Sequence, residues 1–159
     1  MSIVHQVLAP GDLDEIYNYA NERLARAIPD ENDRMFASWT VAWRREALEH
    51  YLKLGWSFIA REEAAAGSLV KAKVVGFFLA QPFLFFRGQT QTLWLEHVEA
   101  DDDSISKELV SIAIRVAREK HLQRVLIANS DKLEKELAPW SPTQLSDEDK
   151  IAVVKTTKG

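Results

Sequence analysis

The chain has 159 residues, of which 47% are hydrophobic and 28% charged, and its formal net charge is −4. These values are typical of one globular domain over residues 1–159, and the scattered basic residues argue against nucleic acid as a partner. The chain has no cysteine, no signal-peptide pattern at its start and no apolar run long enough to span a bilayer, so we expect a cytoplasmic protein without disulfides or a membrane partner.

The first third of the sequence predicts a strand followed by two helices. Ile3–Leu8 has the pattern of a strand, and Asp12 stands three residues before a glutamate, which is the spacing of a capping box at the start of a helix. Residues 29–33 are polar and predict a loop. Ser38 can cap a second helix, which Gly55 ends in the C′ position that glycine favours.

The middle of the sequence predicts an antiparallel meander. A short strand over residues 56–60 precedes a strongly strand-like run over 74–86, and residues 90–98 return as a third strand. Alternation within the run places Phe77 on one face and Phe78 on the other. Because both faces are then apolar, we expect helices to cover this sheet on both sides.

The last third predicts a helix from Ser104 to Lys120 and a strand over residues 124–128. One or two helical turns follow over residues 131–137, and a last strand covers 151–156. The predicted order is β-α-α-β-β-β-α-β-α-β. It indicates an α/β (α+β) fold with a mixed, mostly antiparallel central sheet and helices on both faces.

This order of elements, at this length, resembles the GNAT superfamily of N-acetyltransferases. In that family a central strand ends in the loop Arg/Gln-x-x-Gly-x-Gly/Ala, which opens the main helix. Its backbone N–H groups point at the pyrophosphate of acetyl-CoA. Leu109-Val110 and Ala117 match the spacing of apolar residues that this helix carries in the family.

Counted back from those residues, the loop is Asp101-Asp102-Asp103-Ser104-Ile105-Ser106. An aspartate therefore replaces the arginine and two serines replace the glycines. A helix N-terminus attracts an anion by about 0.3–1 kcal/mol, whereas two like charges about 4 Å apart repel by about 4 kcal/mol at an effective dielectric of about 20. We therefore expect no bound cofactor and an acidic helix cap at Asp103. If acetyl-CoA does bind, the resemblance implies contacts from Val98, Ser104, Ile105 and Ser106.

Many members of the family also carry a tyrosine that protonates the leaving thiolate. The matching region holds Glu136 and Leu137 instead. The resemblance leaves Glu96 or Glu99 as the base that would deprotonate an amine. A solvent-facing or hydrogen-bonded carboxylate at a sheet end is the simpler interpretation of both. His97 should point away from Glu96 by strand alternation, and the histidines show no metal-binding spacing.

Two functions remain open from the sequence. The first is a GNAT-fold protein that is non-catalytic and acts by binding a ligand or a protein. The alternative is an atypical acetyl-CoA-dependent N-acetyltransferase that acts on a small amine or a protein amine. We also expect a homodimer or a protein partner that uses the aromatic Phe83–Phe86 hairpin or an exposed sheet edge, although core packing of these rings is the simpler interpretation.

Overall fold

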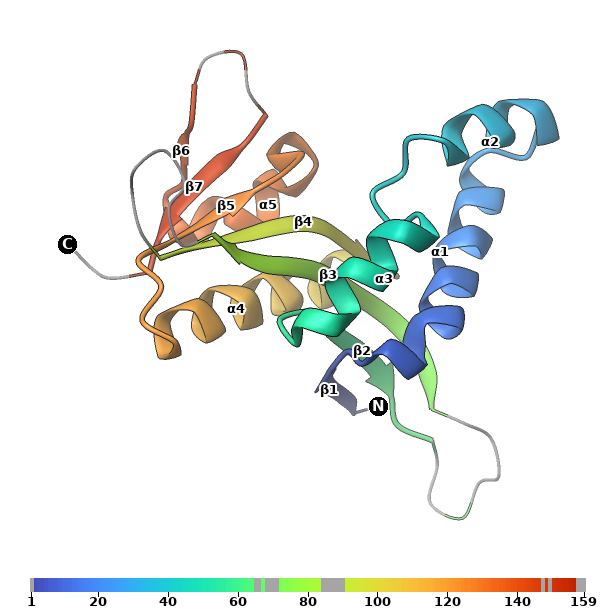
Figure 1. The fold of residues 1–159 in the computed structure, drawn as a ribbon, viewed down its shortest axis with the longest axis horizontal. Helices are drawn as coiled ribbons and strands as arrows, with labels where there is room; N and C mark the ends of the chain where they lie inside the picture. The colour runs from blue at the N-terminus through green and yellow to red at the C-terminus, as the bar shows by residue number, and fades with distance from the viewer. Residues whose placement is uncertain are drawn as a thin grey trace.

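In the computed structural model, the described residues form a single sheet of seven strands in the order β1-β2-β3-β4-β5-β7-β6 (Figure 1). The structure describes residues 2–64, 67, 72–83, 91–146, 148 and 150–156. Among the described strands, only β4 and β5 pair in parallel, and the other neighbours are antiparallel. The strands are β1 (Ile3–Val7), β2 (Phe58–Glu62), β3 (Lys73–Phe83), β4 (Thr92–Ala100), β5 (Arg124–Ile127), β6 (Thr143–Gln144) and β7 (Ala152–Lys155).

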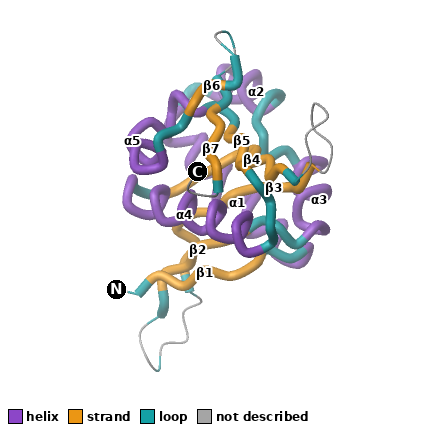
Figure 2. The backbone as a smooth tube through the Cα atoms, turned by 90° about the vertical axis from the view of Figure 1, so that its left-hand side faces the viewer, coloured by secondary structure: helices purple, strands orange, loops and turns teal. Residues whose placement is uncertain are grey.

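Helices cover both faces of this sheet, as the sequence predicts (Figures 1 and 2). One face packs against α1 (Leu13–Ala27) and α3 (Arg45–Leu54), and its core includes Phe77 and Leu79. The other face packs against α4 (Asp103–Glu119) and the short α5 (Glu134–Leu137), and its core includes Phe78. All three of these β3 side chains are fully buried, which confirms the expected burial of both faces.

The parallel pair of β4 and β5 creates the opening that positions the site. Their register runs from Thr92 opposite Arg124 to Leu95 opposite Ile127, where β5 ends. Asn129 then adopts a left-handed conformation, which asparagine tolerates, and turns the chain away from the sheet. Within the described residues, the second half of β4, from residue 96 onward, therefore has no strand beside it on the β5 side.

The helical region before β2 differs from the sequence prediction. Residues 29–33 were expected to form a loop, but Asp30 caps an additional helix, α2 (Glu31–Ser38), by accepting the N–H of Asp33 at 3.0 Å. The helix expected to begin at Ser38 begins only at Arg45, as α3. Capping at Asp30 competes with loop formation, and sequence pattern alone did not separate these outcomes. The left-handed Gly55 ends α3 as predicted.

Two smaller predictions also need correction. Asp12 precedes α1, but its carboxylate accepts the N–H of Ala9 at 2.9 Å and makes no cap bond to α1, because a short 3₁₀ turn over residues 10–12 intervenes. The two-residue strand β6 was not predicted. Of the Phe83–Phe86 hairpin, only Phe83 lies within the described residues, and its ring stacks on Trp94. Association through this hairpin stays a prediction.

Candidate functional site

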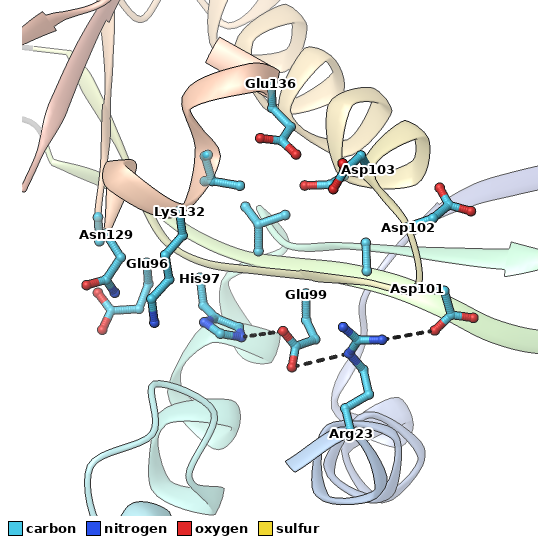
Figure 3. A pocket seen from close by; sticks show the side chains of 15 residues that line it. Arg23, Glu96, His97, Glu99, Asp101, Asp102, Asp103, Asn129, Lys132 and Glu136 are labelled. Atoms are coloured by element: carbon cyan, nitrogen blue, oxygen red, sulfur yellow. Dashed lines mark hydrogen bonds and ion pairs between the residues drawn. The ribbon is translucent and has the colours of Figure 1, made fainter. Parts of the chain in front are cut away.

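A pocket of about 340 Å³ lies where β4 parts from β5. The second half of β4 and the start of α4 form two of its walls, and the segment after β5 forms a third. Arg23 reaches it from α1. Figure 3 shows the side chains that line this pocket, which we call the cleft pocket. A second pocket of about 470 Å³ adjoins it and shares Glu96, His97, Asn129 and Lys132.

A β-bulge brings neighbouring residues of β4 to the same side of the strand. Leu79 pairs with His97 and the next residue, Ala80, pairs with Leu95, so Glu96 is the extra residue in β4. A bulge re-aims side chains that strict alternation would separate. Glu96 and His97 consequently both line the cleft pocket, and the predicted opposite orientation of the two is wrong (Figure 3).

The Glu96 carboxylate is held by two aromatic side chains. It accepts a short hydrogen bond from the indole Nε1 of Trp94. The hydroxyl of Tyr51, on α3, also bonds to it, and burial together with this carboxylate raises the pKa of Tyr51 well above its ordinary value. These contacts satisfy Glu96 within the protein.

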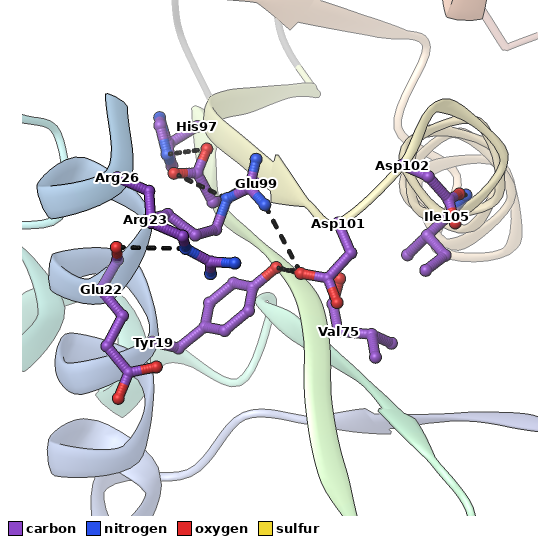
Figure 4. Close-up of polar contacts among 10 residues, drawn as sticks. All are labelled: Tyr19, Glu22, Arg23, Arg26, Val75, His97, Glu99, Asp101, Asp102 and Ile105. Carbon is purple, nitrogen blue, oxygen red and sulfur yellow. Dashed lines mark hydrogen bonds and ion pairs between the residues drawn. The ribbon is translucent and has the colours of Figure 1, made fainter. Parts of the chain in front are cut away.

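Arg23 lies between two carboxylates, those of Glu99 on β4 and of Asp101 in the loop after it (Figure 4). Its Nε lies 3.5 Å from Glu99 Oε1 and its Nη1 lies 3.5 Å from Asp101 Oδ1. Burial raises the pKa of Glu99 and outweighs the opposing effect of Arg23. Burial, with Lys132 and Arg23 nearby, lowers the pKa of His97 to about 4, so this imidazole is neutral at pH 7. Among the described residues, His97 Nε2 is buried without a hydrogen-bond partner, and Glu99 Oε2 lies 3.7 Å away.

The three consecutive aspartates point in different directions. Asp101 accepts a 2.8 Å hydrogen bond from the hydroxyl of Tyr19, on α1, in addition to its contact with Arg23. Burial, and then this carboxylate, raise the pKa of Tyr19. Asp103 is the first residue of α4, is largely exposed and lies 4.0 Å from Lys135 Nζ.

The helix cap is Asp102 and not the expected Asp103. Asp102 Oδ1 accepts the N–H of Ile105 at 3.0 Å and the hydroxyl of Ser104 at 2.9 Å. These donors lower the pKa of Asp102. The helix begins one residue earlier than predicted, which moves the N-cap by one position. The first N–H groups of α4 are therefore directed at a carboxylate of the chain itself.

Glu136 enters the cleft pocket from α5. The residue is only 5% exposed, yet it makes no hydrogen bond or ion pair with any residue that the structure describes. Its carboxylate points into the pocket, toward the Asp103 side (Figure 3). Glu136 is the residue found where the resemblance expects a tyrosine, so the sequence had marked its position but not its burial.

The structure brings together some of the predicted site residues and separates others. Glu96 and Glu99, the candidate bases, both line the cleft pocket, as do Val98 and Ser106. Ser104 does not line it, and Ile105 is buried in the core beneath α4. The pocket also contains residues that sequence reasoning did not select, namely Arg23, Asn129 and Lys132.

The cleft pocket is strongly acidic. Its lining holds six carboxylates, from Glu96, Glu99, Asp101, Asp102, Asp103 and Glu136, against the two cations of Arg23 and Lys132. No group of three or more His, Asp or Glu side chains in the described part of the chain is arranged to hold a metal ion. The acidic side chains are thus spread along the pocket and not gathered around one point.

Three solved structures with the same fold are described as acetyltransferases or a probable acetyltransferase. The PaiA N-acetyltransferase from Thermoplasma acidophilum, solved with coenzyme A, matches with a TM-score of 0.66 and 15% identity over 98% of this chain and 99% of its own. A probable acetyltransferase from Staphylococcus epidermidis matches with a TM-score of 0.64 and 15% identity, over 98% of this chain and 100% of its own. A GNAT family acetyltransferase from Brucella melitensis, solved with acetyl-CoA, matches with a TM-score of 0.63 and 13% identity, over 99% of this chain and 90% of its own.

This chain therefore has the fold of the GNAT acetyltransferases. At these identities the likeness concerns the fold alone. No family model matches the sequence, and no curated protein matches it. Within the described residues, no helix has both the length and the apolar character that a membrane crossing needs.

Proposed function

We propose that this protein is a GNAT-fold binding protein whose cleft pocket does not take acetyl-CoA and which does not transfer acetyl groups. The observation that carries the proposal is the bond from the Ile105 N–H to the Asp102 carboxylate. This N–H belongs to the helix terminus that the resemblance assigns to the cofactor pyrophosphate. A pyrophosphate placed there would have to displace the carboxylate or remain beside it.

Charge around the helix terminus supports the same proposal. Asp103 and Glu136 line the same end of the pocket as Asp102, whereas Arg23 is already shared between Glu99 and Asp101. Like charges beside the helix terminus oppose the attraction that the helix dipole gives to an anion. The residues present do not fit a pyrophosphate, and we assign no chemical step to one.

Calorimetric titration of CoA and acetyl-CoA tests the proposal directly. We expect no measurable binding to the wild-type protein at physiological salt, and micromolar or tighter binding would refute the proposal. Asp102→Gly frees the Ile105 N–H and removes one negative charge, so it should make CoA binding easier to detect. Asp103→Gly removes the same charge without freeing this N–H and serves as the matched control.

The second candidate function is the N-acetyltransferase. The pKa of Glu99 is raised by burial, as a general base requires, and Glu136 reaches the pocket from the position that the resemblance gives to a general acid. In this function Glu99 is a better base than Glu96, because Trp94 and Tyr51 already hold the Glu96 carboxylate. Release of free CoA thiol from acetyl-CoA in the presence of an amine would establish this function, and a Glu99→Gln variant should abolish it.

A further inference from the structure

We propose that an apolar stripe on α2 binds the same stripe on a second copy of this chain, about a two-fold axis. The stripe, which we call the α2 stripe, consists of Met35, Phe36 and Trp39. Its contact with a second copy does not depend on the proposed function. Three observations carry the proposal: the exposure of these side chains, an apolar hollow beside them, and opposite charges at the two ends of the helix.

The side chains of the α2 stripe are large, apolar and exposed. Their exposed fractions are 48% for Met35, 57% for Phe36 and 58% for Trp39. Phe36 and Trp39 are three residues apart, which places them on one face of the helix, and their ring centroids lie 5.0 Å apart in an edge-to-face contact. A cluster of large apolar side chains on the surface, unlike a single one, marks an interaction site.

The α2 helix is held to the rest of the chain mainly by polar bonds. It has eight residues, none of them buried, and Figure 1 shows it beyond the end of α1, away from the sheet. Asp30 caps it, and Arg34 Nη1 donates to the carbonyl of Ile28 at 3.1 Å. Short helices are marginal in water and gain most of their stability by packing an apolar face. Contact with a second copy would bury the face that the described part of the chain leaves exposed.

An open hollow of about 550 Å³ lies beside the α2 stripe, between α1 and α2. The apolar part of its wall comes from Tyr17, Leu24 and Ala25 on α1 and from Met35. In a two-fold contact both copies present the same patch, so the patch must hold a projection and a recess together. The exposed Phe36 ring is such a projection and the hollow is such a recess. Because this chain supplies both, a second copy of it fits the surface.

The charges at the two ends of α2 favour an antiparallel contact. Asp33 is exposed in the first turn, and Arg44 Nη1 lies 3.2 Å from the carbonyl oxygen of Trp39 at the other end. Neither Asp33 nor Arg44 forms an ion pair with a residue that the structure describes. Asp33 and Trp39 are about 9 Å apart along the helix, at about 1.5 Å per residue. A two-fold axis beside Phe36 would therefore place Asp33 of each copy opposite Arg44 of the other, and such complementary charges fix the orientation of a contact.

Sedimentation equilibrium of the whole chain tests the proposal. We expect a monomer at about 1 μM and a dimer at about 500 μM, because a contact made by one short helix falls at the weak end of protein interfaces. Phe36→Ser combined with Trp39→Ser should raise the concentration needed for dimerisation at least about tenfold. A wild-type chain that stays monomeric at every concentration would overturn the proposal, and so would a dimer that the double substitution leaves unchanged.

Val7→Ser combined with Leu54→Ser is the matched control. These two side chains are also apolar and exposed, at 50% and 40%, and they lie outside α2. The control should dimerise as the wild type does. An equal loss of association in both double variants would mean that the copies adhere through any apolar surface, which contradicts the proposal.

Mixing two charge reversals tests the two-fold axis itself. Asp33→Lys alone and Arg44→Glu alone should each weaken dimerisation, because each contact then joins two like charges. In an equimolar mixture of the two variants, every contact between unlike copies again joins an acidic and a basic side chain. The mixture should therefore dimerise more tightly than either variant, and less so as salt rises. A mixture no tighter than its components would overturn the antiparallel contact. Should Arg44→Glu fail to fold, the aromatic double variant still decides the proposal.

Discussion

Gly76, on β3, is the position where the fold leaves least room beside the site. A Cβ atom added there would lie 2.9 Å from the backbone oxygen of Glu99, 3.0 Å from Leu109 Cδ1 and 3.1 Å from Ile105 Cγ2. The first of these neighbours is backbone in the adjacent strand and cannot rotate away. Gly76→Ala must therefore push β4 or α4 away from β3.

Overpacking of a well-packed core costs about 1–3 kcal/mol. Because the closest contact is to a backbone atom within the sheet ladder, we expect a cost of about 2–3 kcal/mol for Gly76→Ala. At about 2–4 °C per kcal/mol for a chain of this size, the melting temperature should fall by about 4–12 °C.

Thermal unfolding monitored by circular dichroism measures this effect. Gly11→Ala is the control, because a Cβ atom at Gly11 would meet no heavy atom within 4 Å. Its melting temperature should stay close to that of the wild type. If the melting temperature of Gly76→Ala also equals that of the wild type, α4 and β4 do not pack against β3 as closely as these distances indicate, and the prediction is refuted.

The other predictions concern pH and capping. The pKa of His97 is lowered from 6.5 to about 4, so between these two pH values the unfolded chain binds a proton that the folded chain does not. The free energy of unfolding should therefore fall as the pH drops from 6.5 to about 4. The loss is at most about 3 kcal/mol, at about 1.4 kcal/mol per pKa unit. Urea unfolding at several pH values should show a shallower loss in His97→Gln, and an equal loss would contradict the reasoning. Glu99 acts in the opposite sense, because its pKa is raised in the folded chain. Its contribution to stability is present at pH values below the ordinary pKa of a glutamate and is lost as the pH rises through the pKa of the folded chain. Asp102→Ala should lower the melting temperature more than Asp103→Ala, because only Asp102 caps α4, and the reverse order would show that the cap bond is unimportant.

Much of the fold could be predicted from the sequence because the relevant signals are local. Apolar periodicity predicted a helix from Ser104 to Lys120, which is close to the observed α4, and Leu109, Val110 and Ala117 are buried there. Alternation in β3 placed Phe77 and Phe78 on opposite faces, and the structure covers both with helices. The periods of helices and strands are set by the geometry of the backbone itself, so they can be recognised in the sequence without knowledge of distant contacts.

The candidate site was only partly predictable. The acidic loop and the candidate bases Glu96 and Glu99 were visible in the sequence, and so was the glutamate at position 136. The bulge at Glu96 was not visible, because an extra residue in one strand is defined only by its pairing with another. A strict alternation pattern therefore assigned His97 to the wrong face.

The sequence by itself determined the order of the elements, the apolar faces that they bury and the acidic character of the loop before α4. Only the tertiary structure decided where each charge points. Arg23 is 76 residues from Glu99 along the chain, yet α1 places it between Glu99 and Asp101, and Asp102 rather than Asp103 meets the helix terminus. Such pairings depend on distances of a few ångströms between separate elements, and Coulomb energies change steeply over those distances. Local sequence patterns carry no information on them.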